Sequence, residues 1–114
     1  MHVNVSRQGA VAVLHLQGEL TEQNQGQWVE TATNLLSTRG ARLVVDLAAV
    51  PFVNSTGIGD LVRVNSQANV QECRVILAAP SPFVEGVLQT TRLDKFFEVC
   101  PTVEAALARL QPTP

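Results

Sequence analysis

A short polar segment, NSTGIG at residues 54–59, contains the residue types whose spacing could do chemistry in this chain. It follows an apolar run at 43–45, Asp46 and Pro51, and it precedes a stretch with helical spacing. Ser55 is therefore expected at the start of a helix, where unpaired backbone N–H groups and the helix dipole favour negative charge. A phosphate group on Ser55 would be stabilised at such a position.

The same segment has plainer interpretations. Ser55 could be an ordinary N-cap, with its oxygen accepting a hydrogen bond from an N–H two or three residues on, and local sequence by itself favours this role. Gly57 and Gly59 lack a third glycine and a following lysine, so the segment is neither a dinucleotide fingerprint nor a phosphate-binding P-loop. Close helix packing or room for a partner explains the two glycines better.

The chain offers little for an enzyme. A serine hydrolase needs a base, and the two histidines are His2 at the start of the chain and His15 within a strand-like run that it shares with Val11 and Val13. Ser55 also lacks the G-x-S-x-G pattern. Asp46 is interpreted as a solvated or capping carboxylate, since no acidic residue or histidine lies near it in sequence. We expect no enzymatic activity, no metal and no cofactor.

Composition excludes several other classes. The formal net charge is -2 and the eight basic residues are scattered, so nucleic-acid binding is not expected. Cys73 and Cys100 lie far apart, which favours buried free thiols over a metal site. No signal peptide and no run of about 18 apolar residues is present, and we expect a cytoplasmic protein that does not insert into membranes.

The length of 114 residues predicts one domain over residues 1–114, and hydrophobic patterning predicts strands that alternate with helices. Thr21 is the expected N-cap of a helix over 21–38 that buries Trp28, and Thr102 is the expected cap of a terminal helix. Strands are expected at 3–5, 11–16, 43–47, 75–78 and 96–99, further helices start near residues 55 and 82, and residues 111–114 are expected to fray. In such an α/β sandwich three loops, at 18–21, 50–57 and 79–82, should meet at the carboxyl edge of the sheet.

The segment RLVVDLAAVPFVNSTGIGDLV at residues 42–62 resembles the core motif of the STAS domain, the family of bacterial anti-sigma factor antagonists and sulphate-transporter tails. The likeness extends to GEL at 18–20, LDKFF at 93–97 and PTVEAAL at 101–107. It covers about residues 3–110. The resemblance implies an α/β fold with a mixed sheet of four or five strands, mostly parallel, flanked by about four helices.

The resemblance also implies site residues. The family's helix-start motif commonly reads D-S-S-G or D-S-T-G, and its first hydroxyl is phosphorylated by a partner kinase; that residue here is Ser55, with Thr56 as the second choice. Asn54 replaces the usual aspartate, and Thr21 stands where an acidic residue often follows GEL. Asn and Thr are acceptable caps, so the fold should not suffer. The expected partner-binding set is Glu19, Thr21, Asn54, Ser55, Thr56, Gly57, Gly59, Asp60 and Arg63, with Asp60 and Arg63 on the exposed side of the helix.

The implied function is a bacterial protein-interaction switch. Unmodified, the domain would bind an anti-sigma factor serine kinase and so free a sigma factor; phosphorylated on Ser55, it would release that kinase, and a serine phosphatase would reverse the modification. The alternative is a STAS scaffold subunit of a signalling or lipid-transport complex that works without phosphorylation. Asn54 gives weight to this alternative, because it removes a negative charge beside the hydroxyl.

Overall fold

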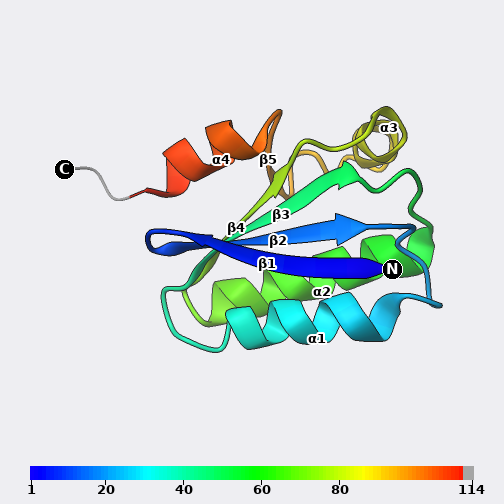
Figure 1. Ribbon diagram of the computed structural model, residues 1–114. Helices are drawn as coiled ribbons and strands as arrows, with labels where there is room; N and C mark the ends of the chain where they lie inside the picture. Colours follow the sequence, from blue (N-terminus) through cyan, green and yellow to red (C-terminus); the bar gives the residue numbers. More distant parts are fainter. Residues whose placement is uncertain (112–114) are drawn as a thin grey trace.

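The computed structural model describes residues 1–111, which form one five-stranded sheet in the order β1-β2-β3-β4-β5 (Figure 1). β1 and β2 form an antiparallel hairpin, and β2 to β5 are parallel to one another. The strands are β1 (His2–Gln8), β2 (Val11–Gln17), β3 (Arg42–Ala49), β4 (Arg74–Ala78) and β5 (Glu98–Cys100). The predicted mixed, mostly parallel sheet is confirmed.

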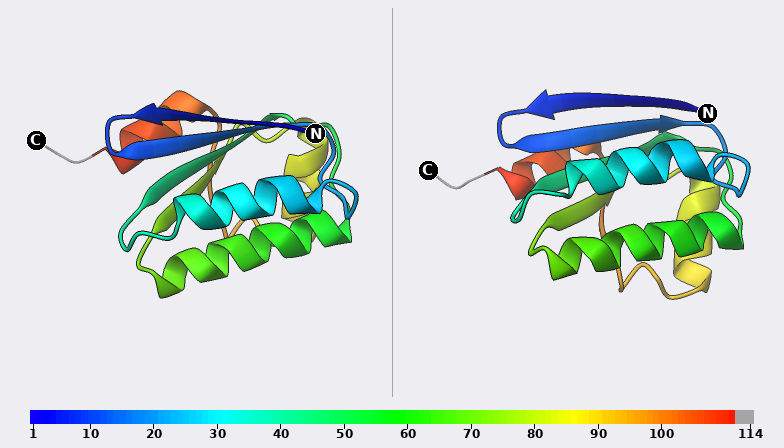
Figure 2. Two further views of the ribbon diagram at one scale, coloured as in Figure 1. Left: turned by 60° about the horizontal axis from the view of Figure 1, so that its bottom comes forward. Right: turned by 90° about the horizontal axis from the view of Figure 1, so that it is seen from below.

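Helices cover both faces of this sheet. α1 (Gln25–Leu35) and α2 (Ser55–Val70) lie side by side on one face (Figure 2), and α4 (Val103–Leu110) lies on the other. α3 (Pro82–Thr90) lies beside the end of the sheet at which β3 ends (Figure 1). The four helices found within residues 1–111 agree with the predicted number of about four.

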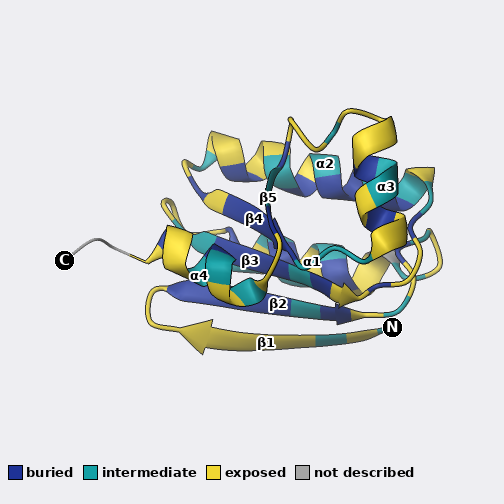
Figure 3. Ribbon diagram, turned by 90° about the horizontal axis from the view of Figure 1, so that it is seen from above, coloured by how far each residue is buried: buried dark blue, intermediate teal, exposed yellow. Residues whose placement is uncertain are grey.

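The core has two parts, one on each face of the sheet. The larger part lies between the sheet and α1 and α2 and includes Trp28, Leu14 and Leu61; the smaller lies beneath α4 and includes Val44, Ile76 and Cys100. Because β2 and β3 are covered on both faces, they are buried along most of their length (Figure 3), which explains their continuous apolar runs. Cys73 and Cys100 are both buried and free, as predicted.

The first helix differs from its prediction. α1 begins at Gln25, not Thr21, and ends at Leu35, not residue 38. Residues 21–24 form a turn instead, in which the Asn24 N–H donates to the Thr21 carbonyl oxygen over 3.1 Å and the Thr21 hydroxyl oxygen accepts from the Gln23 N–H over 3.3 Å. The predicted cap role of Thr21 is therefore wrong, because local hydrogen bonds of this turn use its polar groups.

The end of the chain follows the prediction more closely. Thr102 caps α4, with its side chain accepting from the Ala105 N–H over 3.0 Å. β5 begins at Glu98 rather than residue 96, and Phe96 stays 45% exposed. Of the tail expected to fray, Gln111 donates its side-chain amide to the Gln8 carbonyl oxygen over 3.1 Å, and residues 112–114 lie outside the described part. None of the described helices is long and apolar enough to cross a membrane.

Candidate functional site

The start of α2 is capped by Asn54. This residue has extended backbone angles (φ -110°, ψ -175°), and its side-chain oxygen Oδ1 accepts a hydrogen bond from the Gly57 N–H over 3.0 Å. Ser55 is the first residue of the helix and is exposed. The interpretation of Ser55 as an ordinary N-cap is thus wrong, because its neighbour already performs that role.

The three loops predicted to converge do meet beside Ser55. Leu20 forms a parallel bridge with Val53, which tightens the contact between the first two loops. The Leu20 N–H donates to the Phe52 carbonyl oxygen over 3.0 Å, and the Asn54 N–H donates to the Leu20 carbonyl oxygen over 3.2 Å. Ser81 joins the third loop, because its hydroxyl donates to the Val50 carbonyl oxygen over 2.7 Å. The GEL segment therefore fixes the position at which α2 starts.

The two glycines of the motif have different surroundings. A Cβ atom on Gly57 would overlap the carbonyl oxygen of Leu20 and lie 2.8 Å from the Leu20 Cβ, so only glycine permits α2 to approach this loop so closely. A Cβ atom on Gly59 would meet nothing within 4 Å. The expected close packing is therefore confirmed for Gly57, whereas the space beside Gly59 is open.

A carboxylate that the sequence analysis missed lies at this site. Oε2 of Glu22 accepts a hydrogen bond from the side-chain nitrogen Nδ2 of Asn54 over 2.8 Å. This bond, with smaller contributions from the Glu22 backbone N–H and the Thr56 side chain, outweighs a partial desolvation and holds the pKa of Glu22 below its usual value. The available signal was an acidic residue at position 22, one place after Thr21, because the resemblance expects an acid at position 21.

The buried face of α2 corrects one predicted pair. Asp60 is only 2% exposed and lies on the inner face with Gly57, Leu61, Val64 and Ala68, whereas the sequence analysis placed it outside. Its carboxylate pairs with the guanidinium of Arg63, whose side chain is 65% exposed. Asp60 lies one turn after Gly57, on the same face of the helix that packs against Leu20. Arg63 is therefore largely exposed to solvent, and Asp60 pairs with it from the buried side of the helix.

Two aromatic rings flank the site. Phe52, three residues before Ser55, is 36% exposed, and Phe83 at the start of α3 is 45% exposed. Their ring centroids lie 5.1 Å apart with the planes tilted by 34°. Exposed aromatic side chains that pack together form the apolar anchors common in protein interfaces.

The Asp46 carboxylate has a histidine partner, although none lies near it in sequence. Its Oδ2 lies 2.8 Å from Nδ1 of His15 on the neighbouring strand, its Oδ1 accepts from the Ala48 N–H over 3.0 Å, and Nε2 of His15 lies 3.0 Å from the Ser6 hydroxyl. His15 is partly buried, as predicted. We interpret this series of side-chain hydrogen bonds as a tie between the strands β1, β2 and β3, because all three residues lie within regular strands.

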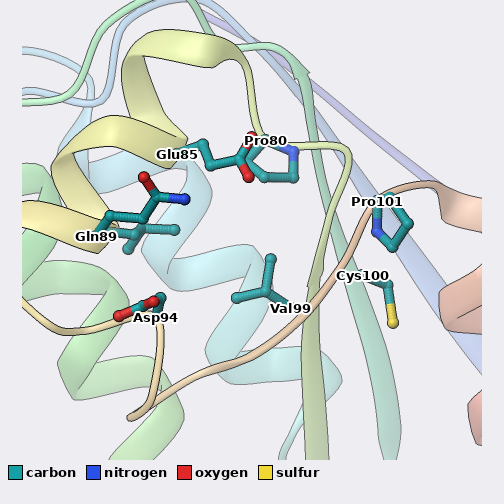
Figure 4. A pocket seen from close by; sticks show the side chains of 8 residues that line it. Pro80, Glu85, Gln89, Asp94, Val99, Cys100 and Pro101 are labelled. Atoms are coloured by element: carbon teal, nitrogen blue, oxygen red, sulfur yellow. The ribbon is translucent and has the colours of Figure 1, made fainter.

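A separate cavity of about 340 Å³ lies between α3, the turn that follows it and β5 (Figure 4). Glu85, Gln89 and Asp94 provide its polar lining, whereas the sulfur of Cys100 points away from them in the view. Its lining includes none of the residues 54–59. Within residues 1–111 no group of three or more His, Cys, Asp or Glu side chains is placed to hold a metal ion.

Fold and site together define a small α/β domain with an exposed serine at the start of a helix. The model of the STAS domain family matches residues 2–106, so this chain belongs to the STAS domain family.

Solved structures with the same fold include an anti-sigma factor antagonist from Mycobacterium paratuberculosis (TM-score 0.87, 23% identity, covering 97% of this chain and 94% of that one). The anti-sigma factor antagonist SpoIIAA in its unphosphorylated form is similar at a TM-score of 0.75 and 24% identity, covering 96% of each chain. The Bacillus cell fate determinant SpoIIAA in its phosphorylated form has a TM-score of 0.72 and 22% identity, covering 96% of this chain and 100% of that one.

Proposed function

We propose that this protein is an anti-sigma factor antagonist that binds an anti-sigma factor serine kinase while Ser55 is unmodified and releases it when Ser55 is phosphorylated. The observation that carries the proposal is that Ser55 is exposed at the first position of α2 while Asn54 performs the capping. Among the described side chains, none forms a hydrogen bond with the Ser55 hydroxyl, so this group is available for modification.

The chemistry of the switch belongs to the partner. The Ser55 oxygen would form a bond to the γ-phosphorus of ATP, the bond from that phosphorus to ADP would break, and the hydroxyl proton would pass to a base of the kinase. This domain supplies only the acceptor, so we propose no enzymatic activity for it. A serine phosphatase would hydrolyse the phosphoester to regenerate the free hydroxyl, and both reactions belong in the cytoplasm of a bacterium.

Modification would act through charge rather than refolding. A phosphate group adds about 1.5 to 2 negative charges and is tolerated at a helix N-terminus, but it is costly to bury against a partner that is built for a neutral hydroxyl. A loss of about 3 kcal/mol of binding energy already weakens affinity more than a hundredfold. SpoIIAA has been solved in both an unphosphorylated and a phosphorylated form, and this precedent in a protein of similar fold supports the proposal.

The proposed docking surface consists of the exposed groups around Ser55. Phe52 and Phe83 provide apolar area, Arg63 provides a positive charge, and Gly59 leaves room for close approach. Glu19, Thr21 and Thr56 complete the surface, with Asn54 and Gly57 shaping it from beneath. This combination of central aromatic groups and a charged rim is typical of protein interfaces.

The test measures incorporation of phosphate from ATP by an anti-sigma factor kinase, taken from the genome that encodes this chain. We expect stoichiometric incorporation into the wild type and into Thr56→Ala, and none into Ser55→Ala. Incorporation that persists in Ser55→Ala would move the site to Thr56 or elsewhere. Binding of the same kinase to the unmodified and phosphorylated forms, measured by calorimetry, should differ at least a hundredfold.

A second candidate is a scaffold that works without phosphorylation, and one observation favours it. Position 54, directly before Ser55, carries an amide that is already bound to Gly57 and Glu22, where a carboxylate is usual in the family. In that case no kinase would modify the protein, and Ser55→Asp would bind the partner complex as well as the wild type does.

A further inference from the structure

We propose that Glu22 is the acidic residue of the Ser55 site: its carboxylate is held beside unmodified Ser55 by Asn54, and a phosphate on Ser55 repels it and so releases the turn at residues 19–24. The inference deepens the proposed function and rests on it for its biological meaning. Its physical part, an electrostatic coupling between positions 22 and 55, stands on the geometry of the site.

Glu22 reaches the residue that directly precedes Ser55. Its Oε2 accepts from Asn54 Nδ2 over 2.8 Å, and the Thr56 side chain makes a small further contribution to the lowered pKa of this carboxyl group. The hydrogen bond to Asn54 therefore holds this carboxylate at the start of α2, against the residue that directly precedes Ser55. The negative charge that aspartate would bring at position 54 is thus present, but it comes from another loop.

Asn54 is well suited to this arrangement because the two polar atoms of its side chain form different hydrogen bonds. Oδ1 accepts from the backbone of α2 and Nδ2 donates to Glu22, so one side chain links the helix to the turn. An aspartate could make the first bond, but it has no donor for the second. Asn54 and Glu22 therefore form one hydrogen-bonded pair that an aspartate at position 54 could not form.

A phosphate group at Ser55 would place a second, larger negative charge beside the Glu22 carboxylate. Glu22 is exposed, so it can rotate into solvent instead of remaining next to the phosphate. The turn would then lose its side-chain tie to Asn54, while the Asn24 side-chain bond to the Glu19 carbonyl oxygen and the backbone bonds of Leu20 would remain. We therefore expect a local release of the turn and no change of fold.

The experiment is a double-mutant cycle on free energies of unfolding in low salt, with Ser55→Asp as the charged variant and Glu22→Gln as the neutral one. The introduced glutamine keeps an oxygen that can accept from Asn54, so Glu22→Gln removes charge while preserving the hydrogen bond. We expect Ser55→Asp to change the unfolding equilibrium constant differently in the two backgrounds. The change should favour the folded state about two- to fivefold more in the Glu22→Gln background than in the wild type. Raising the salt concentration to about 1 M should abolish most of that difference.

Glu19→Gln is the matched control, because it neutralises another exposed carboxylate of the same turn without touching Asn54. The cycle of Glu19→Gln with Ser55→Asp should show a clearly smaller coupling. Equal effects of Ser55→Asp in the wild-type and Glu22→Gln backgrounds would overturn the proposal, and so would equal coupling at positions 19 and 22.

The side-chain amide of Asn54 gives a second measurement. Its ¹H–¹⁵N resonances should move toward the positions of a solvent-exposed amide in Ser55→Asp or in phosphorylated protein. They should not move when Ser55→Asp is added to Glu22→Gln. Unmoved resonances in Ser55→Asp would contradict the release of the turn. Failure of the proposed function would give a different result. Wild type and Ser55→Asp would then bind the partner with equal affinity, and the double-mutant cycle on stability would be unaffected.

Discussion

Gly57 lies directly against the backbone of Leu20: a Cβ atom at position 57 would overlap the Leu20 carbonyl oxygen. The same carbonyl oxygen accepts the Asn54 N–H over 3.2 Å, so the loop before α1 and the start of α2 form one unit. This contact fixes where Ser55 stands, and it explains why two segments more than thirty residues apart in the sequence form a single site.

The two glycines of the motif should respond differently to alanine. Gly57→Ala should lower the free energy of unfolding by about 2 kcal/mol or more, because the new methyl group overlaps backbone that cannot move alone. Gly59→Ala should raise it by about 0.4 to 1 kcal/mol, since the site is open and alanine favours helix. Urea unfolding of both variants checks this pair, and equal destabilisation would contradict the difference in their surroundings.

Stability should depend on pH through Glu22. The pKa of this carboxyl group is lower in the folded chain than its usual value, so the unfolded state binds more protons as the pH falls through the acid range. Its contribution is fully present above the usual glutamate pKa and disappears as the pH falls through the lowered one. Glu22→Gln should therefore lose less stability than wild type on acidification from about pH 6 to pH 3.

The control for this pH dependence is Glu19→Gln, which leaves the contact between Glu22 and Asn54 in place. Its thermal midpoint should follow the wild-type profile over the same pH range. Parallel profiles of wild type and Glu22→Gln would show that Glu22 contributes nothing to the acid sensitivity.

Asn54→Asp should destabilise the domain even though asparagine and aspartate are about equally good caps. The variant keeps the acceptor for the Gly57 N–H, but it loses the donor to Glu22 and sets two carboxylates against each other. Adding Glu22→Gln should restore stability, because the introduced glutamine can donate to the new aspartate. Thermal unfolding of the single and double variants at pH 7 is the measurement, and absence of rescue would argue against the pairing.

The aromatic pair should matter for binding and little for folding. Phe83→Ala should weaken binding of the partner kinase by about 2 kcal/mol, roughly thirtyfold, if Phe52 and Phe83 anchor the interface. Phe96→Ala is the matched control: its ring is also 45% exposed, but it lies beside Asn65 and Asn69 in the second half of α2. Equal losses of affinity in the two variants would mean that the docking surface lies elsewhere.

The hydrogen bonds of the tie between strands should stabilise the fold more where their side chains are more buried. Asp46→Ala removes the bonds to His15 and to the Ala48 N–H and should cost about 1 to 2 kcal/mol. Ser6→Ala removes only the exposed outer member and should stay within about 0.5 kcal/mol of wild type. Guanidinium unfolding distinguishes the two, and a larger cost for Ser6→Ala would reverse this assignment.

The sequence by itself determined the order of elements, the buried strands, the core position of Trp28 and the exposure of Ser55 at a helix start. These features depend on local patterning: short valine-rich runs, proline and glycine breaks, and apolar residues at helical spacing. The convergence of the three loops also followed from the sequence, because parallel strands place their carboxyl ends on one edge.

The tertiary structure decided the role of each side chain at that edge of the sheet. Asn54 rather than Ser55 caps α2, Thr21 does not cap α1, and Asp60 is buried on the face of α2 that also carries Gly57. Glu22 joins Asn54, and His15 joins Asp46, across 32 and 31 residues of chain. Local propensities cannot predict such pairs, because each partner finds the other only after the sheet and the loops have placed them within hydrogen-bond distance.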